Sequence, residues 1–168
     1  MALIRDGKIV EDAWRHAEDA EALDHDGPLF AGLAHWRQHF GQLKSRNRPT
    51  GLRLESDEAP EDVEDLLAYV DAIALSFPKF TDGRAYSHAR ILRERYGFDR
   101  EIRACGEILP DQVLLMTRCG FDTFELPEDA KAETYLRAFQ AFGVFYQPAT
   151  DNRPFAARLR RRQEEKAS

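Results

Sequence analysis

Residues 71–107, DAIALSFPKFTDGRAYSHARILRERYGFDREIRACGE, contain two apolar runs separated by one helical segment. The runs DAIALSF (Asp71–Phe77) and EIRACGE (Glu101–Glu107) have the length and the alternation of strands. The segment between them, over about Gly83–Tyr96, predicts an amphipathic helix. A strand, a helix and a second strand with short connections are typical of a right-handed βαβ unit with parallel strands.

The same alternation of strand and helix extends to both sides of this unit. Upstream, GLRLES (Gly51–Ser56) precedes a predicted helix over about Pro60–Val70. Downstream, a predicted helix over about Pro110–Cys119 leads to DTFEL (Asp122–Leu126), which precedes another helix over about Asp129–Phe142. We therefore expect an α/β protein made of β/α repeats, with a four-stranded, mostly parallel sheet.

One face of the predicted sheet carries charged side chains. Successive residues of a strand point to opposite faces, so the apolar residues share one face and the charged residues the other. The charged set is Arg53, Glu55, Arg103, Glu107 and Glu125. A parallel sheet with helices on one face and charges on the other resembles half of a (β/α) barrel.

Four units make only half of a barrel, so something must cover the charged face. The candidates are the N-terminal segment, a second copy of the chain or another protein. The charges then either pair with one another as a structural ion network or form a binding or assembly face.

The N-terminal part of the chain adds a hairpin and a helix to this core. Two short apolar runs around Asp6-Gly7 predict a β-hairpin over Leu3–Val10. Apolar residues at helical spacing predict a helix from Phe30 to about Ser45. The expected organisation is one β/α domain over 1–150, with hairpin and linker at 1–28, the β/α core at 51–142, and a basic tail, flexible or helical, at 151–168.

Composition excludes several classes of protein. The formal net charge of −6 argues against a general nucleic-acid binder, and the sequence has no apolar run long enough to span a bilayer. The start of the sequence does not resemble a secretory signal, so we expect a cytoplasmic protein. The spacing of Cys105 and Cys119 matches no metal motif. His35 and His39 are four residues apart, which can hold a metal on a helix, but no third ligand stands nearby, so we expect no metal site. The sequence contains no GxGxxG, P-loop or GxSxG motif for a dinucleotide, a nucleotide or serine hydrolysis.

A candidate site follows the strand that ends at Phe77, because β/α proteins place function where their parallel strands end. Lys79 comes directly before a helix, and Thr81 or Asp82 can cap the first amides of that helix. Gly83 allows a ligand to approach those amides, and Arg84 adds a positive charge. Together these residues predict a site for phosphate, sulfate or a carboxylate. Alternatively, Asp82 occupies the amides itself and pairs with Lys79.

Further polar residues lie within reach of this edge. They complete the predicted ligand-binding set and are Tyr86, Ser87, Arg90, Arg103, Asp111 and Gln112. The candidates for catalysis are Lys79, Arg103 and Glu107. Glu107 and Asp111 could act as a general acid and base, although Asp111 also suits the start of a helix for its favourable interaction with the helix dipole.

Three motifs make the central part of the chain similar to a known family. They read FPKFTDGRxYS over Phe77–Ser87, RAxGExLxDQ over Arg103–Gln112 and RCGFDxF over Arg118–Phe124. In these motifs the chain resembles a bacterial family of unknown function that is usually encoded beside the haemoprotein subunit of assimilatory sulfite reductase.

The resemblance implies an accessory protein of sulfate and sulfite reduction, which binds the sulfite reductase system or an anionic ligand. One alternative is a small oxidoreductase, or another enzyme, that acts on an anionic sulfur metabolite with a noncovalent cofactor. Another is a non-catalytic β/α module that dimerises. The expected partners are the sulfite reductase haemoprotein and a second copy of the chain. No cofactor motif is evident in the sequence, and electron transfer would require a noncovalently bound flavin on the charged face.

Overall fold

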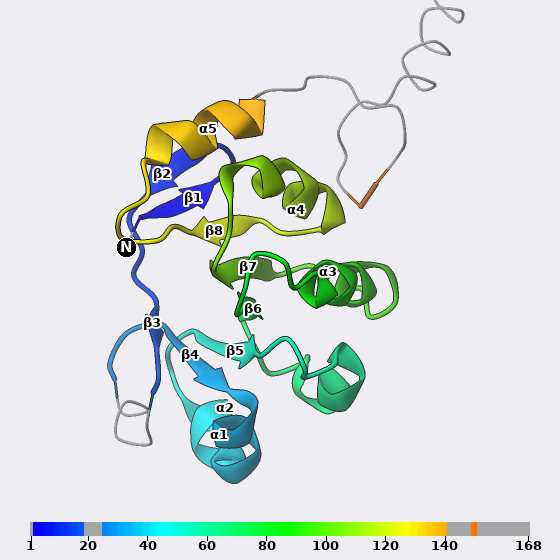
Figure 1. Cartoon of the computed structure of the whole chain (residues 1–168). Helices are drawn as coiled ribbons and strands as arrows, with labels where there is room; N and C mark the ends of the chain where they lie inside the picture. Colours follow the sequence, from blue (N-terminus) through cyan, green and yellow to red (C-terminus); the bar gives the residue numbers. More distant parts are fainter. Residues whose placement is uncertain (1, 19–24, 141–148, 151–168) are drawn as a thin grey trace, which may run out of the picture.

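A computed structural model describes residues 2–18, 25–140 and 149–150, within which eight strands form one curled sheet (Figure 1). The strands are β1 (Leu3–Arg5), β2 (Lys8–Val10), β3 (Arg15–His16), β4 (Leu29–Gly32), β5 (Thr50–Leu54), β6 (Ala72–Phe77), β7 (Glu101–Gly106) and β8 (Thr123–Glu125). The helices are α1 (Leu33–Gln38), α2 (Phe40–Ser45), α3 (Arg84–Glu94), α4 (Val113–Cys119) and α5 (Ala132–Gln140), together with the 3-10 helices η2 (Pro60–Leu66) and η3 (Pro110–Gln112).

The order of strands in the sheet is β2-β1-β8-β7-β6-β5-β4-β3. Strands β3 to β8 are parallel and follow one another in chain order, whereas the hairpin β1–β2 joins β8 in antiparallel orientation. Sequential parallel strands linked through helices form an arc of a barrel. The expected α/β class and the half-barrel-like parallel sheet are confirmed.

The predicted number of four strands is wrong, because the sheet has eight. Strand β4 was assigned to a helix, since its four residues run into α1 without a turn signal between them. The expected helix at 30–45 is in fact β4 followed by two six-residue helices that meet at His39. The predicted hairpin is present around Asp6-Gly7, both with positive φ, but its pairing with β8 links distant parts of the sequence.

Two helices of the core also differ from expectation. The segment expected as a helix over about Pro60–Val70 is the 3-10 helix η2, and the next one begins as the 3-10 turn η3 before α4. The predicted tail at 151–168 and the end of the helix expected to reach Phe142 lie outside the described residues. The extent of the single domain stays a prediction.

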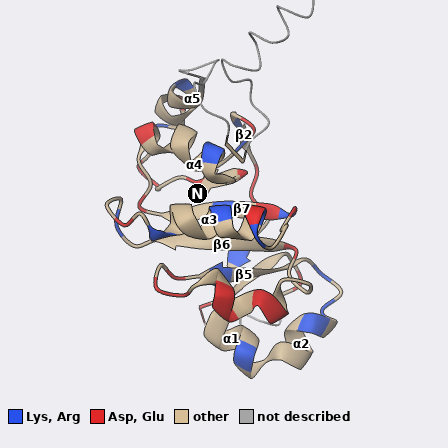
Figure 2. Cartoon of the chain, turned by 90° about the vertical axis from the view of Figure 1, so that its right-hand side faces the viewer, with Lys and Arg blue, Asp and Glu red and all other residues tan. Residues whose placement is uncertain are grey.

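Helices cover the outer face of the sheet and bury its apolar side chains. In Figure 2, which looks onto this side, α3 lies in front of β6 and β7. Leu52, Ile73, Ile102 and Phe124 come from four neighbouring strands and share one core cluster with Trp36 of α1. The predicted division into an apolar and a charged face is therefore present within the strands, whereas Glu55 and Glu107 of the predicted charged set follow the ends of β5 and β7. Among the described helices, none has the length and apolar character needed to cross a membrane.

Candidate functional site

The inner face of the curled sheet, opposite the helices, is centred on Arg103. Its guanidinium donates to Asp12 at 2.8 Å, to Glu125 at 3.1 Å and to Glu101 at 2.9 Å. Glu101 also accepts from the Thr123 hydroxyl at 2.8 Å. Arg103 is 0% exposed, so this cluster is an internal ion network.

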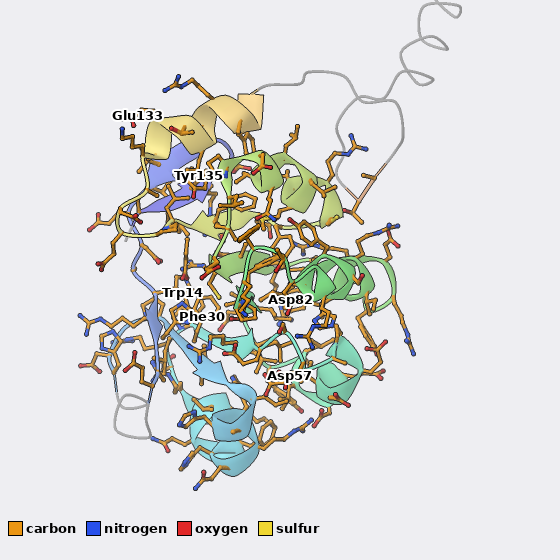
Figure 3. The ribbon with its side chains drawn as sticks, in the orientation of Figure 1. Trp14, Phe30, Asp57, Asp82, Glu133 and Tyr135 are labelled. Carbon is orange, nitrogen blue, oxygen red and sulfur yellow. The ribbon has the colours of Figure 1, made fainter. Side chains whose placement is uncertain are left out.

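The N-terminal strap, residues 12–16, covers this network. Trp14 stacks on Phe30 with ring centroids 4.4 Å apart (Figure 3). His16 stacks on the same ring at 5.2 Å. The Arg103 guanidinium lies over the Phe30 ring at 4.9 Å, and His16 Nε2 is 2.8 Å from a Glu125 carboxylate oxygen. Of the three candidates for covering the charged face, the N-terminal segment is thus the one observed.

Electrostatics on the inner face keep the network ionised. Burial opposes ionisation of Glu125, but hydrogen bonds and charges from His16 and Arg103 outweigh it and lower the pKa of the carboxyl. For Arg103, burial is outweighed by Glu101 and Asp12, so the pKa of the guanidinium is raised. Burial strongly raises the pKa of the neighbouring Cys105 thiol, which is therefore a poor nucleophile.

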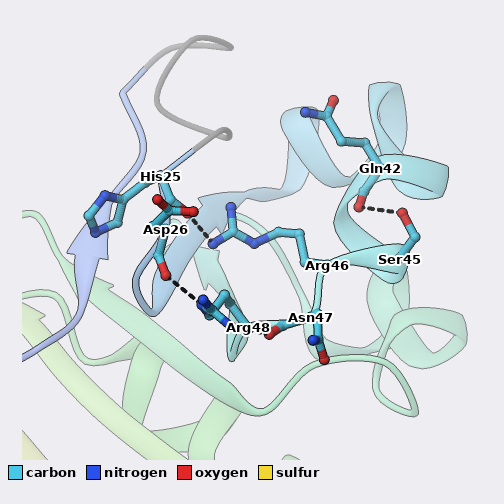
Figure 4. Close-up of a pocket in the computed structure, with 7 residues that line it drawn as sticks. All are labelled: His25, Asp26, Gln42, Ser45, Arg46, Asn47 and Arg48. Carbon is cyan, nitrogen blue, oxygen red and sulfur yellow. Dashed lines mark hydrogen bonds between the residues drawn. The ribbon is translucent and has the colours of Figure 1, made fainter.

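At the amino edge, where the parallel strands begin, arginines bind backbone carbonyl groups. Arg93 donates to the carbonyls of Gly120 and Phe98 and to the Asp122 carboxylate, and Asp122 in turn accepts from the Ile102 amide at 2.8 Å. A hollow at the same edge is lined by His25, Asp26, Gln42, Ser45, Arg46, Asn47 and Arg48 (Figure 4). There, Arg46 donates to the carbonyls of His25 and Gly27. These contacts hold strand ends and helix ends together and indicate a structural role.

The residues of the predicted anion site that follow β6 lie at the carboxyl edge, where the parallel strands end. Asp82 accepts from the Arg84 guanidinium at 2.7 Å and from its backbone amide at 3.2 Å, and Arg84 also donates to the Ser56 hydroxyl at 2.8 Å. Hydrogen bonds from Arg84 lower the pKa of Asp82 well below its ordinary value. Asp82 therefore occupies the Arg84 guanidinium and amide, which an anion at this site would also use. The Lys79 side chain is exposed, and within the described parts of the chain its ammonium makes no hydrogen bond or ion pair; the Lys79 carbonyl accepts from the Asp82 amide at 2.9 Å.

The remaining predicted residues are spread along α3 and the next loop. Thr81, Gly83, Ser87, Glu107 and Asp111 are exposed. Arg90 pairs with Glu94 one turn further along α3 at 3.1 Å. Tyr86 packs edge-on against Phe77, and burial raises the pKa of its hydroxyl to about 12. Arg103 is separated from this set, because it lies buried on the inner face.

A groove of about 390 Å³ lies on the carboxyl edge, between the loops that follow β6, β7 and β8. Its lining residues are Phe80, Glu107, Ile108, Leu109, Pro110, Pro127, Asp129, Ala130, Lys131, Thr134 and Tyr135. Phe80 is 47% exposed and Leu109 is 38% exposed, which is unusual for large apolar side chains near one another. The Tyr135 hydroxyl donates to the Ile108 carbonyl at 2.9 Å and holds the base of the groove.

Residues of the sequence motifs fix the walls of this groove. Gln112 donates to the Phe80 carbonyl at 2.8 Å, and its side-chain oxygen accepts from the Leu109 amide at 3.0 Å. Gly106 has a φ of +95°, and a Cβ there would overlap the Phe77 carbonyl. Gln112 ties two loops together, and its place in a ligand-binding set stays a prediction.

The apolar residues of the groove are not among the residues predicted from the sequence. Phe80 and Leu109 lie within the motifs, each three residues past the end of a strand, where an apolar side chain is not needed for a core. An apolar residue at such a position is the sequence signal for this groove. Within the described part of the chain, no three His, Cys, Asp or Glu side chains are grouped as a metal site would require.

Comparison with known proteins identifies one family. The model of the family described as "Bacterial protein of unknown function (DUF934)" matches residues 51–156, which span β5 to β8 and include all three sequence motifs. No curated protein matches the chain.

Proposed function

The chain belongs to the bacterial family of unknown function DUF934, and we propose that it is a binding protein whose carboxyl-edge groove docks another protein. The observation that carries this proposal is the exposure of Phe80 and Leu109 on walls fixed by Gln112. Exposed apolar residues on a prearranged concave surface favour binding, because few groups must be reordered when a partner docks.

The inner face gives less support for catalysis. Its charged side chains already pair with one another, and Arg103, one of the three catalytic candidates, is buried beneath the strap. Glu107 lies on the groove and Lys79 on the adjoining loop, so the other two candidates remain accessible.

For the partner we propose the haemoprotein subunit of assimilatory sulfite reductase. The support is the resemblance of the three motifs to a family usually encoded beside that subunit. The protein would then be an accessory factor of sulfite reduction.

Co-purification tests this assignment. The tagged protein is expected to retain the haemoprotein, whereas Phe80→Asp/Leu109→Asp is expected to lose it. Ile9→Asp is the matched control, because Ile9 is 51% exposed on the hairpin strand β2, outside the groove. Failure of the wild-type protein to retain the haemoprotein, with the tag on either partner, would contradict the assignment.

A deletion strain supplies the functional test. We expect poor growth on sulfate and on sulfite but normal growth on cysteine, with rescue by the wild-type chain and by Ile9→Asp only. Growth on sulfite with failure on sulfate would move the protein upstream of sulfite reduction.

A second candidate, supported by the exposed side chain of Lys79 directly before α3, is binding of a small sulfur anion beside that helix. This site could serve an enzyme with a noncovalent flavin. Calorimetric titration with sulfite and sulfate tests it, with Lys79→Ala expected to abolish the heat of binding. A purified protein without flavin absorbance and without such heat would contradict it.

A further inference from the structure

The rim of the groove carries carboxylates that the fold leaves unpaired. Glu107 and Asp129 line the groove, and Glu128 lies directly beside Asp129. All three are exposed, and none makes an ion pair with another described residue. Lys131 is the single basic residue among those that line the groove.

On the inner face, by contrast, the carboxylates form ion pairs. There, Asp12, Glu101 and Glu125 each pair with Arg103 at 2.8–3.1 Å. The fold thus pairs one group of acids with a buried arginine and leaves the other group without an ion pair around an apolar surface. Free carboxylates beside exposed apolar groups complement a cationic partner that also carries an apolar anchor.

We infer that the groove recognises a protein segment with one large apolar side chain flanked by Lys or Arg. The apolar side chain would pack against Phe80 and Leu109, and the flanking cations would pair with Glu107 and Asp129. This inference rests on the proposed docking role of the groove and adds the chemistry of the partner segment.

The groove is ready to receive such a segment without rearrangement. Gln112 holds the Phe80 and Leu109 loops at fixed separation, and Tyr135 fixes Ile108 beneath them. A preformed surface loses little conformational entropy on binding. A short peptide should therefore bind by itself, without the rest of the partner.

Selection from a displayed library of random peptides tests the inference without assuming a partner. The wild-type protein is used for selection, and Phe80→Asp/Leu109→Asp for counter-selection. We expect enriched sequences with a Phe, Leu, Ile, Met or Trp flanked by at least two Lys or Arg. Enrichment of neutral or acidic sequences, or a lack of peptides that discriminate between the two proteins, would overturn the inference.

Binding of the best selected peptide, measured by fluorescence anisotropy, separates the two contributions. Phe80→Ala/Leu109→Ala should weaken binding at least about tenfold, because anchor residues dominate such interfaces. Glu107→Gln/Asp129→Asn should weaken it about 2- to 10-fold, as expected for two exposed ion pairs, and should reduce its dependence on salt. Glu94→Gln, on the exposed side of α3, is the control and should leave affinity unchanged.

These experiments distinguish failure of the inferred peptide chemistry from failure of the proposed partner. Basic peptides that bind the groove while the haemoprotein does not would sustain the inference and reject the partner. Groove-dependent binding of the haemoprotein, with selected peptides that are not basic, would reject the inference and sustain the function. Circular dichroism and urea unfolding of each variant show that the fold is retained.

Discussion

The inner face and the carboxyl-edge groove both combine carboxylates with aromatic or aliphatic side chains, but they differ in burial and in ion pairing. On the inner face, Arg103 is 0% exposed and satisfies three carboxylates beneath Trp14. In the groove, Phe80 is 47% exposed and the acid Glu107 is left unpaired among the described residues. Charge alone thus does not mark a site.

The difference teaches where binding energy is available. A buried guanidinium that already has ion-pair partners gains little binding free energy from a ligand. Exposing it to a ligand would break these ion pairs and destabilise the fold. An exposed apolar surface gains free energy as soon as a partner removes it from water. We therefore expect substitutions on the inner face to lower stability and substitutions in the groove to lower binding.

Arg103→Ala should have the largest effect on stability. It removes the ion-pair partner of Asp12 and one of the partners of Glu101 and of Glu125 on the inner face, which is expected to cost about 3–5 kcal/mol. Arg53→Ala is the matched control, because Arg53 is 35% exposed in its pair with Glu55 and should cost less than about 1 kcal/mol. Urea unfolding measures both, and equal losses would show that burial does not distinguish the two arginines.

Gly106→Ala tests the strand end that supports the groove. Its positive φ and the overlap of a Cβ with the Phe77 carbonyl should cost about 1–3 kcal/mol. Gly32→Ala at the end of β4, where a Cβ meets no atom within 4 Å, should change the free energy of unfolding by less than about 1 kcal/mol. A stable Gly106→Ala protein would contradict the close approach of β7 to the β6 end.

Ionisation of Glu125 should make the free energy of unfolding depend on pH in the acidic range. Its folded-state pKa lies below the ordinary value of 4.5. Ionised Glu125 therefore stabilises the fold fully above about pH 4.5, and this contribution is lost as the pH falls through the lowered pKa.

Glu125→Gln should cost about 1–2 kcal/mol at neutral pH, and this cost should shrink in acid. Unfolding curves are measured for Glu125→Gln over roughly pH 3–7, the range in which carboxyl groups titrate. Glu94→Gln, on the exposed side of α3, is the control. A cost independent of pH would contradict the ion network.

Phe80→Ala/Leu109→Ala should have the smallest effect on stability, within about 0.5 kcal/mol, because neither side chain is buried in the core. Binding of the partner should nevertheless be lost. A large loss of stability, detected by urea unfolding, would mean that these side chains support the fold instead of a partner.

Much of the parallel core could be predicted from the sequence. The strand–helix–strand alternation around Phe77 and the charged residues Arg53, Arg103 and Glu125 on one face follow from period-two and helical patterns. The short strands β3 and β4 could not be predicted, because two to four residues carry too little pattern. The pairing of β1 with β8 depends on contacts between residues more than 100 positions apart.

The candidate site was only partly predictable, for a physical reason. The sequence predicts that Lys79, Asp82, Arg84 and Gln112 lie at the carboxyl edge. It does not show which of these side chains form hydrogen bonds or ion pairs with one another. In the structure, Asp82 pairs with Arg84, and the Gln112 side chain forms hydrogen bonds with two backbone groups. The apolar wall formed by Phe80 emerges only when three loops meet in space.

Site-specific crosslinking in cells tests the central claim most directly. A photoreactive phenylalanine analogue is placed at Phe80 in the groove, at Arg53 on the inner face and at Ile9 on the hairpin, and adducts are identified by mass spectrometry. We predict a crosslink to the sulfite reductase haemoprotein from position 80 and none from positions 53 and 9. A crosslink to that protein from position 53, with none from position 80, would contradict a docking site at the carboxyl edge.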